Sequence, residues 1–140
     1  MKSELSSEIR QLLRKKSNAF CADCFDSCTL LIDVDNGVFL CRSCAKIHEQ
    51  LGFHVKNPLT ENFSDEEIQK LQKGDNETFN KRMMSLFQHD STKIPFGATD
   101  PDRKFFITDK YINKKWFSMI PNENNQSFYN PRHFDIQEEN

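Results

Sequence analysis

Apolar residues near the start of the chain recur at helical spacing. Residues 4–16 place them on one face and arginine and lysine on the other, which predicts an amphipathic helix that ends near Asn18. We expect this helix to open the domain. Its apolar residues are Leu5, Ile9, Leu12 and Leu13.

A different pattern follows, in which β-branched and apolar residues form two short runs around a turn signal. Residues 29–34 (TLLIDV) lead into Asp-Asn-Gly at residues 35–37, and residues 38–40 return as a second strand. From Arg42 the segment RSCAKIHEQL predicts a short helix, and Gly52 suits the left-handed position just after its end. The pattern therefore predicts a β-hairpin followed directly by a helix.

Capping signals mark the next two helices. Ser64 with Glu67 three residues later is a capping-box signature, and the helix that it starts stops at Gly74. Asp75 can then cap another helix, whose apolar spacing of i, i+4, i+7 and i+8 is typical of a core-facing stripe. The stripe consists of Phe79, Met83, Leu86 and Phe87.

The most aromatic segment is predicted to form the last helix. It follows a loop containing Pro95, Gly97 and Asp100, and Pro101 suits its first turn. Aromatic residues at helical spacing are generally core residues, so we expect Trp116 to pack against the domain. The apolar residues of this segment are Phe105, Phe106, Tyr111, Ile112, Trp116 and Phe117.

Length and composition favour one domain followed by a polar segment. A chain of 140 residues falls within the size range of a single domain. From Pro121 onward the chain is rich in Asn, Gln and Glu and has little periodicity. We therefore assign residues 1–120 to the domain and expect residues 121–140 to form a poorly ordered tail.

Charge and hydropathy narrow the choice of partners and location. The 19 Lys and Arg residues are balanced by 21 Asp and Glu, a formal net charge of −2. This balance offers no basic field for nucleic acid, so no nucleic-acid partner is expected. No apolar run approaches the roughly 20 residues that span a bilayer, and the N-terminus is acidic where a signal peptide is basic and then apolar. We expect a cytoplasmic protein.

Five cysteines carry the clearest chemical signal. Four of them follow the spacing C-x2-C-x16-C-x2-C, two thiolate pairs that a folded-back hairpin can bring around one ion. Four thiolates fill every coordination position of zinc, so the ion is structural and not catalytic. The alternatives are Cys28 or His48 as a fourth ligand, or an iron–sulfur cluster, and Cys28 is assigned no role. The predicted ligands are Cys21, Cys24, Cys41 and Cys44.

Motifs between and beyond the cysteines form a more specific pattern. The short ones are FCADC (20–24), NGVFLC (36–41), IH (47–48) and LGFH (51–54). The longer ones are EEIQKLQKGDNETFN (66–80) and RKFFITDKYINKKWF (103–117). Over about residues 5–118 they resemble the zinc-finger domain of ArfGAP proteins, the GTPase-activating proteins of ADP-ribosylation factor (Arf) GTPases.

The resemblance implies an α+β fold with a small zinc-bearing hairpin or three-stranded sheet surrounded by about five helices. It also implies one structural zinc ion and an Arf-family small GTPase as partner. Such domains are not hydrolases themselves, because they insert an arginine beside the phosphates of the GTP that the partner holds. We therefore expect a GTPase activator or a degenerate form of one. We expect it to be a monomer that meets the cytosolic face of Golgi or vesicle membranes through the GTPase.

The position of the catalytic arginine departs from the family pattern. The family's arginine directly follows the Ile-His pair, where this chain has Glu49, so no catalytic residue is assigned. A glutamate brings negative charge toward phosphate oxygens, and this leaves a second hypothesis open. In that hypothesis the domain is a catalytically silent adaptor that binds a GTPase or another protein.

Other polar residues near this position have simpler interpretations. Lys46 and Lys56 are close in sequence but lack the forked donors of arginine. Arg42 is expected to be a solvated surface residue. For His48 and His54 we expect a structural role, in which ring hydrogen bonds tie the finger to the following loop.

Overall fold

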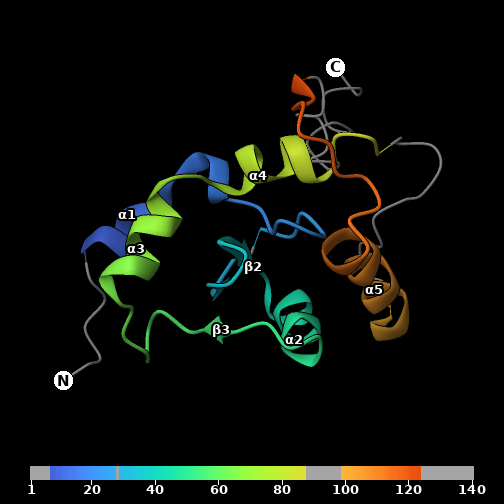
Figure 1. The fold of residues 1–140 in the computed structure, drawn as a ribbon. Coiled ribbons are helices and arrows are strands. Elements are labelled where there is room, and N and C mark those ends of the chain that lie inside the picture. The colour runs from blue at the N-terminus through green and yellow to red at the C-terminus, as the bar shows by residue number, and fades with distance from the viewer. Residues whose placement is uncertain (1–6, 28, 88–98, 124–140) are drawn as a thin grey trace, which may run out of the picture.

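A small antiparallel sheet lies between helices in this computed structural model, which describes residues 7–27, 29–87 and 99–123 (Figure 1). The strand order is β2-β1-β3, and both neighbouring pairs are antiparallel. The predicted α+β class, with a three-stranded sheet and five α-helices in the described part of the chain, is confirmed. The elements are α1 (Ser7–Arg14), the 3-10 helix η1 (Lys16–Asn18), β1 (Leu31–Asp33), β2 (Val38–Leu40), α2 (Arg42–Gln50), β3 (Val55–Lys56), α3 (Asp65–Gln72), α4 (Asn76–Met83), α5 (Asp100–Ile107) and the π-helical turn η2 (Thr108–Ile112).

The hairpin of β1 and β2 forms where the sequence predicts it. Leu31 pairs with Leu40 and Asp33 with Val38 across the two strands. Gly37 closes the turn with a φ of +73°, a conformation that suits glycine because it has no Cβ. The turn therefore forms where its local residues favour it.

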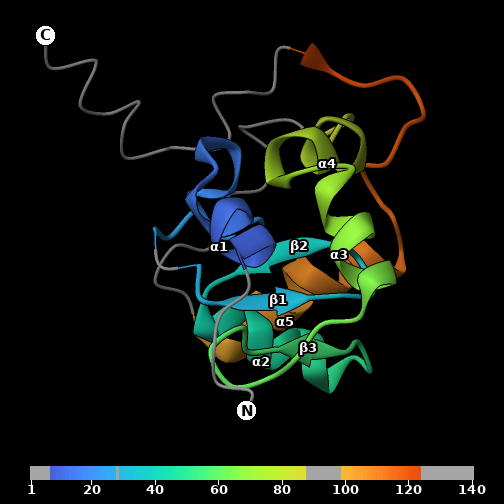
Figure 2. The same cartoon turned by 90° about the vertical axis from the view of Figure 1, so that its left-hand side faces the viewer.

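Strand alternation divides the interior into two cores on opposite faces of the sheet. Figure 2 shows α1 and α3 in front of the sheet and α2 and α5 behind it. Phe39 of β2 and Ile32 of β1 face the α1 and α3 side, where they pack with Ile9 and Leu71. The neighbours of Phe39 in β2 point to the other face, because successive side chains of a strand alternate. The larger core on that side contains the four predicted zinc ligands together with side chains of α2, α4, α5 and η2.

A buried asparagine protects the outer edge of β2. The Asn76 side chain accepts a hydrogen bond from Phe39 N at 2.9 Å and donates to Phe39 O at 2.9 Å. Its backbone N–H donates to Asn18 Oδ1 at 2.8 Å. Asn76 therefore pairs an edge strand that would otherwise expose its backbone groups, and it ties α4 to η1 and β2.

The caps of the middle helices also agree with the sequence. Ser64 Oγ accepts from Glu67 N at 3.1 Å, and the Glu67 carboxylate accepts from Ser64 N at 2.9 Å, so the predicted capping box is present. Asp75 caps α4 by accepting from Thr78 N at 2.7 Å. Short-range side-chain chemistry thus determines where both helices begin.

The predicted apolar stripe after α4 is wrong at one residue. Met83 and Phe87 are buried, but Leu86 is 59% exposed. The cause is that α4 ends at Met83, so the helical spacing no longer applies at Leu86. The Leu86 N–H instead donates to Trp116 O at 2.8 Å in an irregular segment.

The predicted last helix is too long. Regular α5 ends at Ile107, η2 adds one wide turn, and Lys114 takes a φ of +51° that no helix continues through. Trp116 is buried as predicted, in the segment beyond the helix, whereas Phe105 is 74% and Ile112 50% exposed. Helical spacing therefore predicts a buried aromatic residue only where the helix continues and another element packs against that face.

Several predictions from the sequence lie outside the described residues. They concern Leu5, Cys28, the loop with Pro95 and Gly97, and residues 124–140 of the expected tail. The division into residues 1–120 and 121–140 stays a prediction. Within the described ranges, the structure holds no helix with the length and apolar character needed to cross a membrane.

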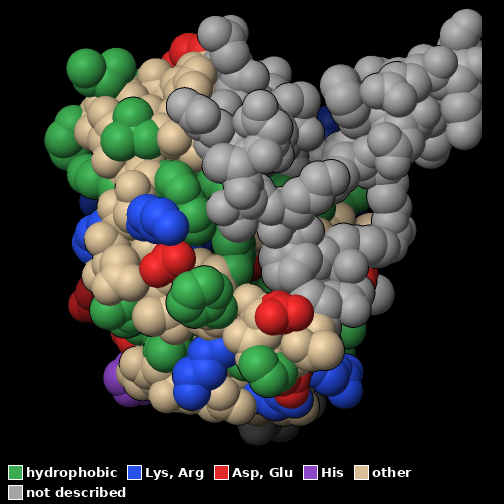
Figure 3. Space-filling view, turned by 90° about the vertical axis from the view of Figure 1, so that its right-hand side faces the viewer, with side chains coloured by type: hydrophobic (Ala, Val, Ile, Leu, Met, Phe, Trp, Pro, Cys, Tyr) green, Lys and Arg blue, Asp and Glu red, His purple; other side chains and the backbone are tan. Residues whose placement is uncertain are grey.

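Charged side chains of both signs are mixed on the face that carries α5. Figure 3 shows lysine and arginine side chains interspersed with aspartate and glutamate, with hydrophobic side chains between them. Nucleic-acid binding requires a clustered basic face. The prediction of no nucleic-acid partner stays a prediction.

We expect Ser64→Ala to lower the free energy of unfolding by about 1 kcal/mol, because it removes the hydroxyl that caps α3. Urea denaturation of the purified chain measures this change. Gln69→Ala, at an exposed position of the same helix, serves as the control and should stay within about 0.5 kcal/mol of wild type. Equal effects of the two substitutions would show that the cap contributes nothing special.

Candidate functional site

The four predicted zinc ligands meet at one point of the structure. Their Sγ atoms all lie within 4.8 Å of one another, and Cys24 Sγ is 3.6 Å from Cys41 Sγ. Zinc–sulfur bonds of about 2.3 Å in a tetrahedron place the sulfurs roughly 3.8 Å apart, so the cluster suits one zinc ion. All four cysteines are buried, and none of them is in a disulfide. The chain holds one structural zinc.

Local backbone geometry prepares both cysteine pairs for the metal. Asp23 N donates to Cys21 Sγ, and Cys44 N donates to Cys41 Sγ, each at 3.5 Å. These bonds favour thiolates over thiols, because an N–H donor stabilises negative charge on sulfur. Cys41 is also the N-cap residue of α2, so the metal centre fixes the point at which this helix starts.

A buried arginine that the sequence analysis did not single out completes the metal centre. Arg103 of α5 is 7% exposed, and its Nη1 donates to Cys44 Sγ at 3.4 Å. Four thiolates around Zn²⁺ carry a net charge of −2, which a neighbouring guanidinium partly offsets. Arg103 therefore joins α5 to the finger by charge as well as by packing.

His48 is not a metal ligand but the centre of a buried charge network. Its Nε2 lies 2.8 Å from Asp23 Oδ2, and its Nδ1 lies 2.6 Å from Asp33 Oδ2. Burial alone would lower the pKa of His48, but the bonds to Asp23 and Asp33 raise that pKa to about 9. At neutral pH the ring is therefore an imidazolium that donates to both carboxylates.

Two residues from the end of the domain complete this network. Lys110 Nζ donates to Asp23 Oδ1 at 2.7 Å, and Tyr111 OH donates to the same oxygen at 2.7 Å. Burial would raise the pKa of Asp23, but Lys110 and His48 together hold it well below the usual range of a carboxyl group. Two carboxylates and two cations thus balance in the interior, with Asp33 as the second carboxylate.

The structural roles expected of the two histidines are confirmed in part. His48 makes ring hydrogen bonds, but they join the first cysteine pair and the hairpin, not the following loop. His54 Nδ1 lies 3.0 Å from Asp35 Oδ2, and His54 N donates to the same oxygen at 2.8 Å. His54 is an exposed residue that fastens the loop after α2 to the hairpin turn.

The outer face of α2 presents Glu49, the residue that the sequence analysis aligned with the family's arginine. Arg42, Lys46 and Glu49 are all exposed, and their spacing places them on one side of the helix. Lys46 Nζ forms a salt bridge with Asp100 Oδ2 at 2.7 Å. Lys56 Nζ, the other lysine considered, forms one with Glu67 Oε1 at 2.9 Å. Both lysines are therefore already paired with carboxylates.

Known proteins resemble this chain both in sequence and in structure. The model of the ArfGap family, described as "Putative GTPase activating protein for Arf", matches residues 6–119. The solved ArfGap domain of HIV-1 Rev binding protein superposes with a TM-score of 0.72 at 28% identity, covering 83% of this chain and 87% of that one.

Curated relatives share the same region. Stromal membrane-associated protein 1 of Mus musculus is 34% identical over 112 residues, 78% of this chain and 25% of the relative. ADP-ribosylation factor GTPase-activating protein AGD12 of Arabidopsis thaliana is 30% identical over 112 residues, which cover 77% of this chain and 33% of the relative. Alpha-protein kinase 1 of Dictyostelium discoideum is 30% identical over 127 residues, which cover 85% of this chain and 9% of the relative. The chain thus spans a third or less of these relatives.

We expect removal of zinc with a strong chelator to abolish the cooperative thermal transition, because zinc binding and folding are one equilibrium in such a site. Far-UV circular dichroism follows the transition, and added zinc should restore it. The same chelator saturated with zinc beforehand is the control and should have no effect. An unchanged transition after verified zinc removal would contradict the structural role.

The raised pKa of His48 predicts a specific pH dependence of stability. Its pKa is about 9 in the folded protein and 6.5 in the unfolded chain, so its stabilisation is complete below pH 6.5 and is lost as pH rises through about 9. The full contribution is on the order of 3 kcal/mol. The measurement is the free energy of unfolding of wild type minus that of His48→Gln across this range. The subtraction cancels the pH dependence of zinc binding, and a difference that does not shrink with pH would refute the charged ring.

Proposed function

The chain belongs to the ArfGap family, and from this premise we propose that it acts on an Arf-type small GTPase as a GTPase-activating domain. The observation that carries the proposal is the family match over residues 6–119, which includes the complete metal centre. The names of several relatives point to the same activity, among them the GTPase-activating protein AGD12. The domain itself hydrolyses nothing and acts on the nucleotide that its partner holds.

The scaffold supports this role because α2 is held at both ends. Cys41 and Cys44 attach its first turn to the metal centre. His48 attaches its last turn to the carboxylates of Asp23 and Asp33. A helix held in this way presents its outer face in one fixed position, which is what a surface must do to place a charge beside a bound nucleotide.

The chemistry that such a surface must supply is positive charge. Hydrolysis of GTP spreads negative charge over the γ-phosphate oxygens, and an arginine inserted beside them accelerates the reaction by about 10³- to 10⁵-fold. In this chain Glu49 occupies that place by the family's motif and is exposed on α2. Its carboxylate opposes the developing charge, so the activity expected of this chain is weaker than that of relatives with arginine.

Two sources of positive charge are compatible with activation by the wild-type chain. Arg42 is the one arginine of α2, and it lies about two turns, or roughly 10 Å, from Glu49 along the same exposed face. The GTPase can also supply the charge from its own sequence, as some GTPases do. Substitution of Arg42 distinguishes the two.

Glu49 favours a second candidate function. A domain with the same surface but a carboxylate at the key position can bind the GTPase without accelerating hydrolysis and serve as an adaptor. The family assignment favours activation, whereas this single side chain favours the adaptor. Both functions require binding to the GTPase, so binding alone does not separate them.

The setting of the domain is part of the proposal. We place it in the cytoplasm as a monomer that reaches the cytosolic face of Golgi or vesicle membranes through its GTPase partner. The support is membership of a family that acts on Arf GTPases and the name of one relative, stromal membrane-associated protein 1.

We expect wild-type protein to raise the rate of single-turnover GTP hydrolysis by Arf-type GTPases above their intrinsic rate. Glu49→Arg should raise it further, by a factor on the order of 10² or more, because it supplies the forked cation at the family position. Arg42→Ala should reduce the wild-type acceleration if Arg42 is the source of charge. Release of labelled phosphate over time measures all of these rates.

A matched control separates a local effect from a general change of charge. Glu8→Arg makes the same charge change at an exposed position of α1 and should leave the hydrolysis rate at the wild-type value. Acceleration by Glu49→Arg alone would assign the chain to the adaptor function. Failure of wild type and Glu49→Arg to bind any of the GTPases would refute both candidate functions.

A further inference from the structure

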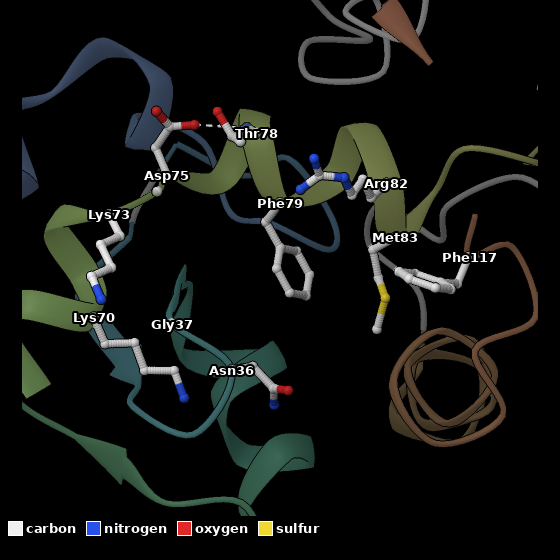
Figure 4. Close-up of a pocket in the computed structure, with 11 residues that line it drawn as sticks. Asn36, Gly37, Lys70, Lys73, Asp75, Thr78, Phe79, Arg82, Met83 and Phe117 are labelled. Atoms are coloured by element: carbon white, nitrogen blue, oxygen red, sulfur yellow. Dashed lines mark hydrogen bonds between the residues drawn. The ribbon is translucent and has the colours of Figure 1, made fainter. Parts of the chain in front are cut away.

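A cavity of about 340 Å³ lies away from the outer face of α2, between the hairpin turn, α3, α4 and the segment after η2. This volume is within the range of small-molecule sites in proteins. Figure 4 shows lysine side chains on one side of the cavity and Met83 with Phe117 on the opposite side. The Phe79 ring points into the space between them.

Three cations line this cavity. Lys70 lies in the last turn of α3, Lys73 is the C-cap residue of the same helix, and Arg82 comes from α4. Lys70 donates one hydrogen bond to the Asp35 carbonyl, and Arg82 Nε donates to Met119 O at 3.3 Å.

Among the described residues none of the three cations forms a salt bridge with a carboxylate. Lys70 does act on Asp35, since burial would raise the pKa of that carboxyl group but His54 and then Lys70 lower it. The charges of Lys73 and Arg82 are the ones most available to a ligand.

The acidic residue of the lining does not cancel this charge. Asp75 forms a salt bridge with Lys15 through its Oδ2, at 3.4 Å, and caps α4 through Thr78 N. Both interactions hold the Asp75 carboxylate at the N-terminal end of α4. Lys15, which lies outside the cavity, offsets the charge of this carboxylate. The lining therefore has a positive excess.

The opposite wall of the cavity is apolar. Phe79 and Phe117 are half-buried, and Met83 is buried beside them. Phe79 is held in place because it stacks on Tyr111 with a centroid distance of 5.8 Å. A small hydrated anion would leave this wall unused, and an apolar ligand would remove the three cations from water without a partner. The ligand must offer negative groups and a compact body together.

We propose that this cavity binds a small molecule that carries two or more phosphate groups on a compact ring. The phosphates meet Lys70, Lys73 and Arg82, since lysine and arginine are the usual phosphate donors and the arginine fork suits a phosphate. The ring packs on Phe79 and Phe117. A free phosphorylated ring and the headgroup of a phosphorylated lipid share this chemistry.

The site goes beyond the proposed function and is tested separately from it. Its cations come from α3 and α4, whereas Glu49 and Arg42 lie on α2. A binding measurement on the chain alone requires no GTPase. Failure of one proposal therefore leaves the other intact.

The test is isothermal titration calorimetry of the whole chain with soluble inositol trisphosphate, alongside co-sedimentation with phosphatidylcholine vesicles that contain phosphatidylinositol bisphosphate. We expect one site per chain and an affinity that falls as salt is raised, because ionic contacts are screened. Binding of the soluble probe supports a free ligand, and binding to the vesicles alone supports a lipid headgroup. Absence of binding in both arms overturns the proposal.

Variants locate the site. Lys73→Glu should weaken binding by about tenfold or more, because it removes a charge-assisted contact and adds a repulsion. Lys104→Glu makes the same charge change at an exposed position of α5 and should bind as wild type does. Lys73→Gln, a milder change, should show a smaller loss and guards against misfolding of the reversal. Equal losses with Lys73→Glu and Lys104→Glu, or inorganic pyrophosphate binding as tightly as inositol trisphosphate, would overturn the assignment.

Discussion

The fold depends on bringing two pairs of thiolates together around one zinc ion across the 16 residues that separate them. The strands of the hairpin between them have three residues each, too few to be stable alone. The metal turns this weak hairpin into a closed unit whose end is also the start of α2. Arg103 then brings α5 against the same centre, so the larger core assembles around the ion.

The second constraint is a neutral set of four buried charges, and it works only as a whole. Asp23 belongs to the first cysteine pair, Asp33 to the hairpin, His48 to α2 and Lys110 to η2. Removal of one member leaves an uncompensated charge in the interior. The resulting loss of stability is far larger than the net stabilisation that an intact buried ion pair provides. The network therefore specifies how these four segments meet, while hydrophobic burial and the metal provide most of the stability.

Features set by neighbouring residues could be predicted from the sequence, whereas features set by distant partners could not. The cysteine spacing, the Ser64 capping box and the turn at Gly37 are local, and all three are present. The bond between Lys110 and Asp23 joins residues 87 positions apart, and no periodicity indicates it. The error at Leu86 has a related cause, since a regular spacing carries no sign of where tertiary contacts end a helix.

Family membership and catalytic capacity are separable in this chain because they rest on different kinds of residue. The zinc ligands and His48 are buried and hold the fold together, the ligands through the metal whose binding is coupled to folding and His48 through its two carboxylate partners. Glu49 is exposed, and an exposed charge typically changes stability by less than about 0.5 kcal/mol. In the proposed complex, the same change would alter the potential at the phosphates of the bound nucleotide by much more, because charges there are shielded from water. In the function we propose, the scaffold places residue 49 at the GTPase whatever its identity, and the charge of that side chain determines whether contact becomes activation.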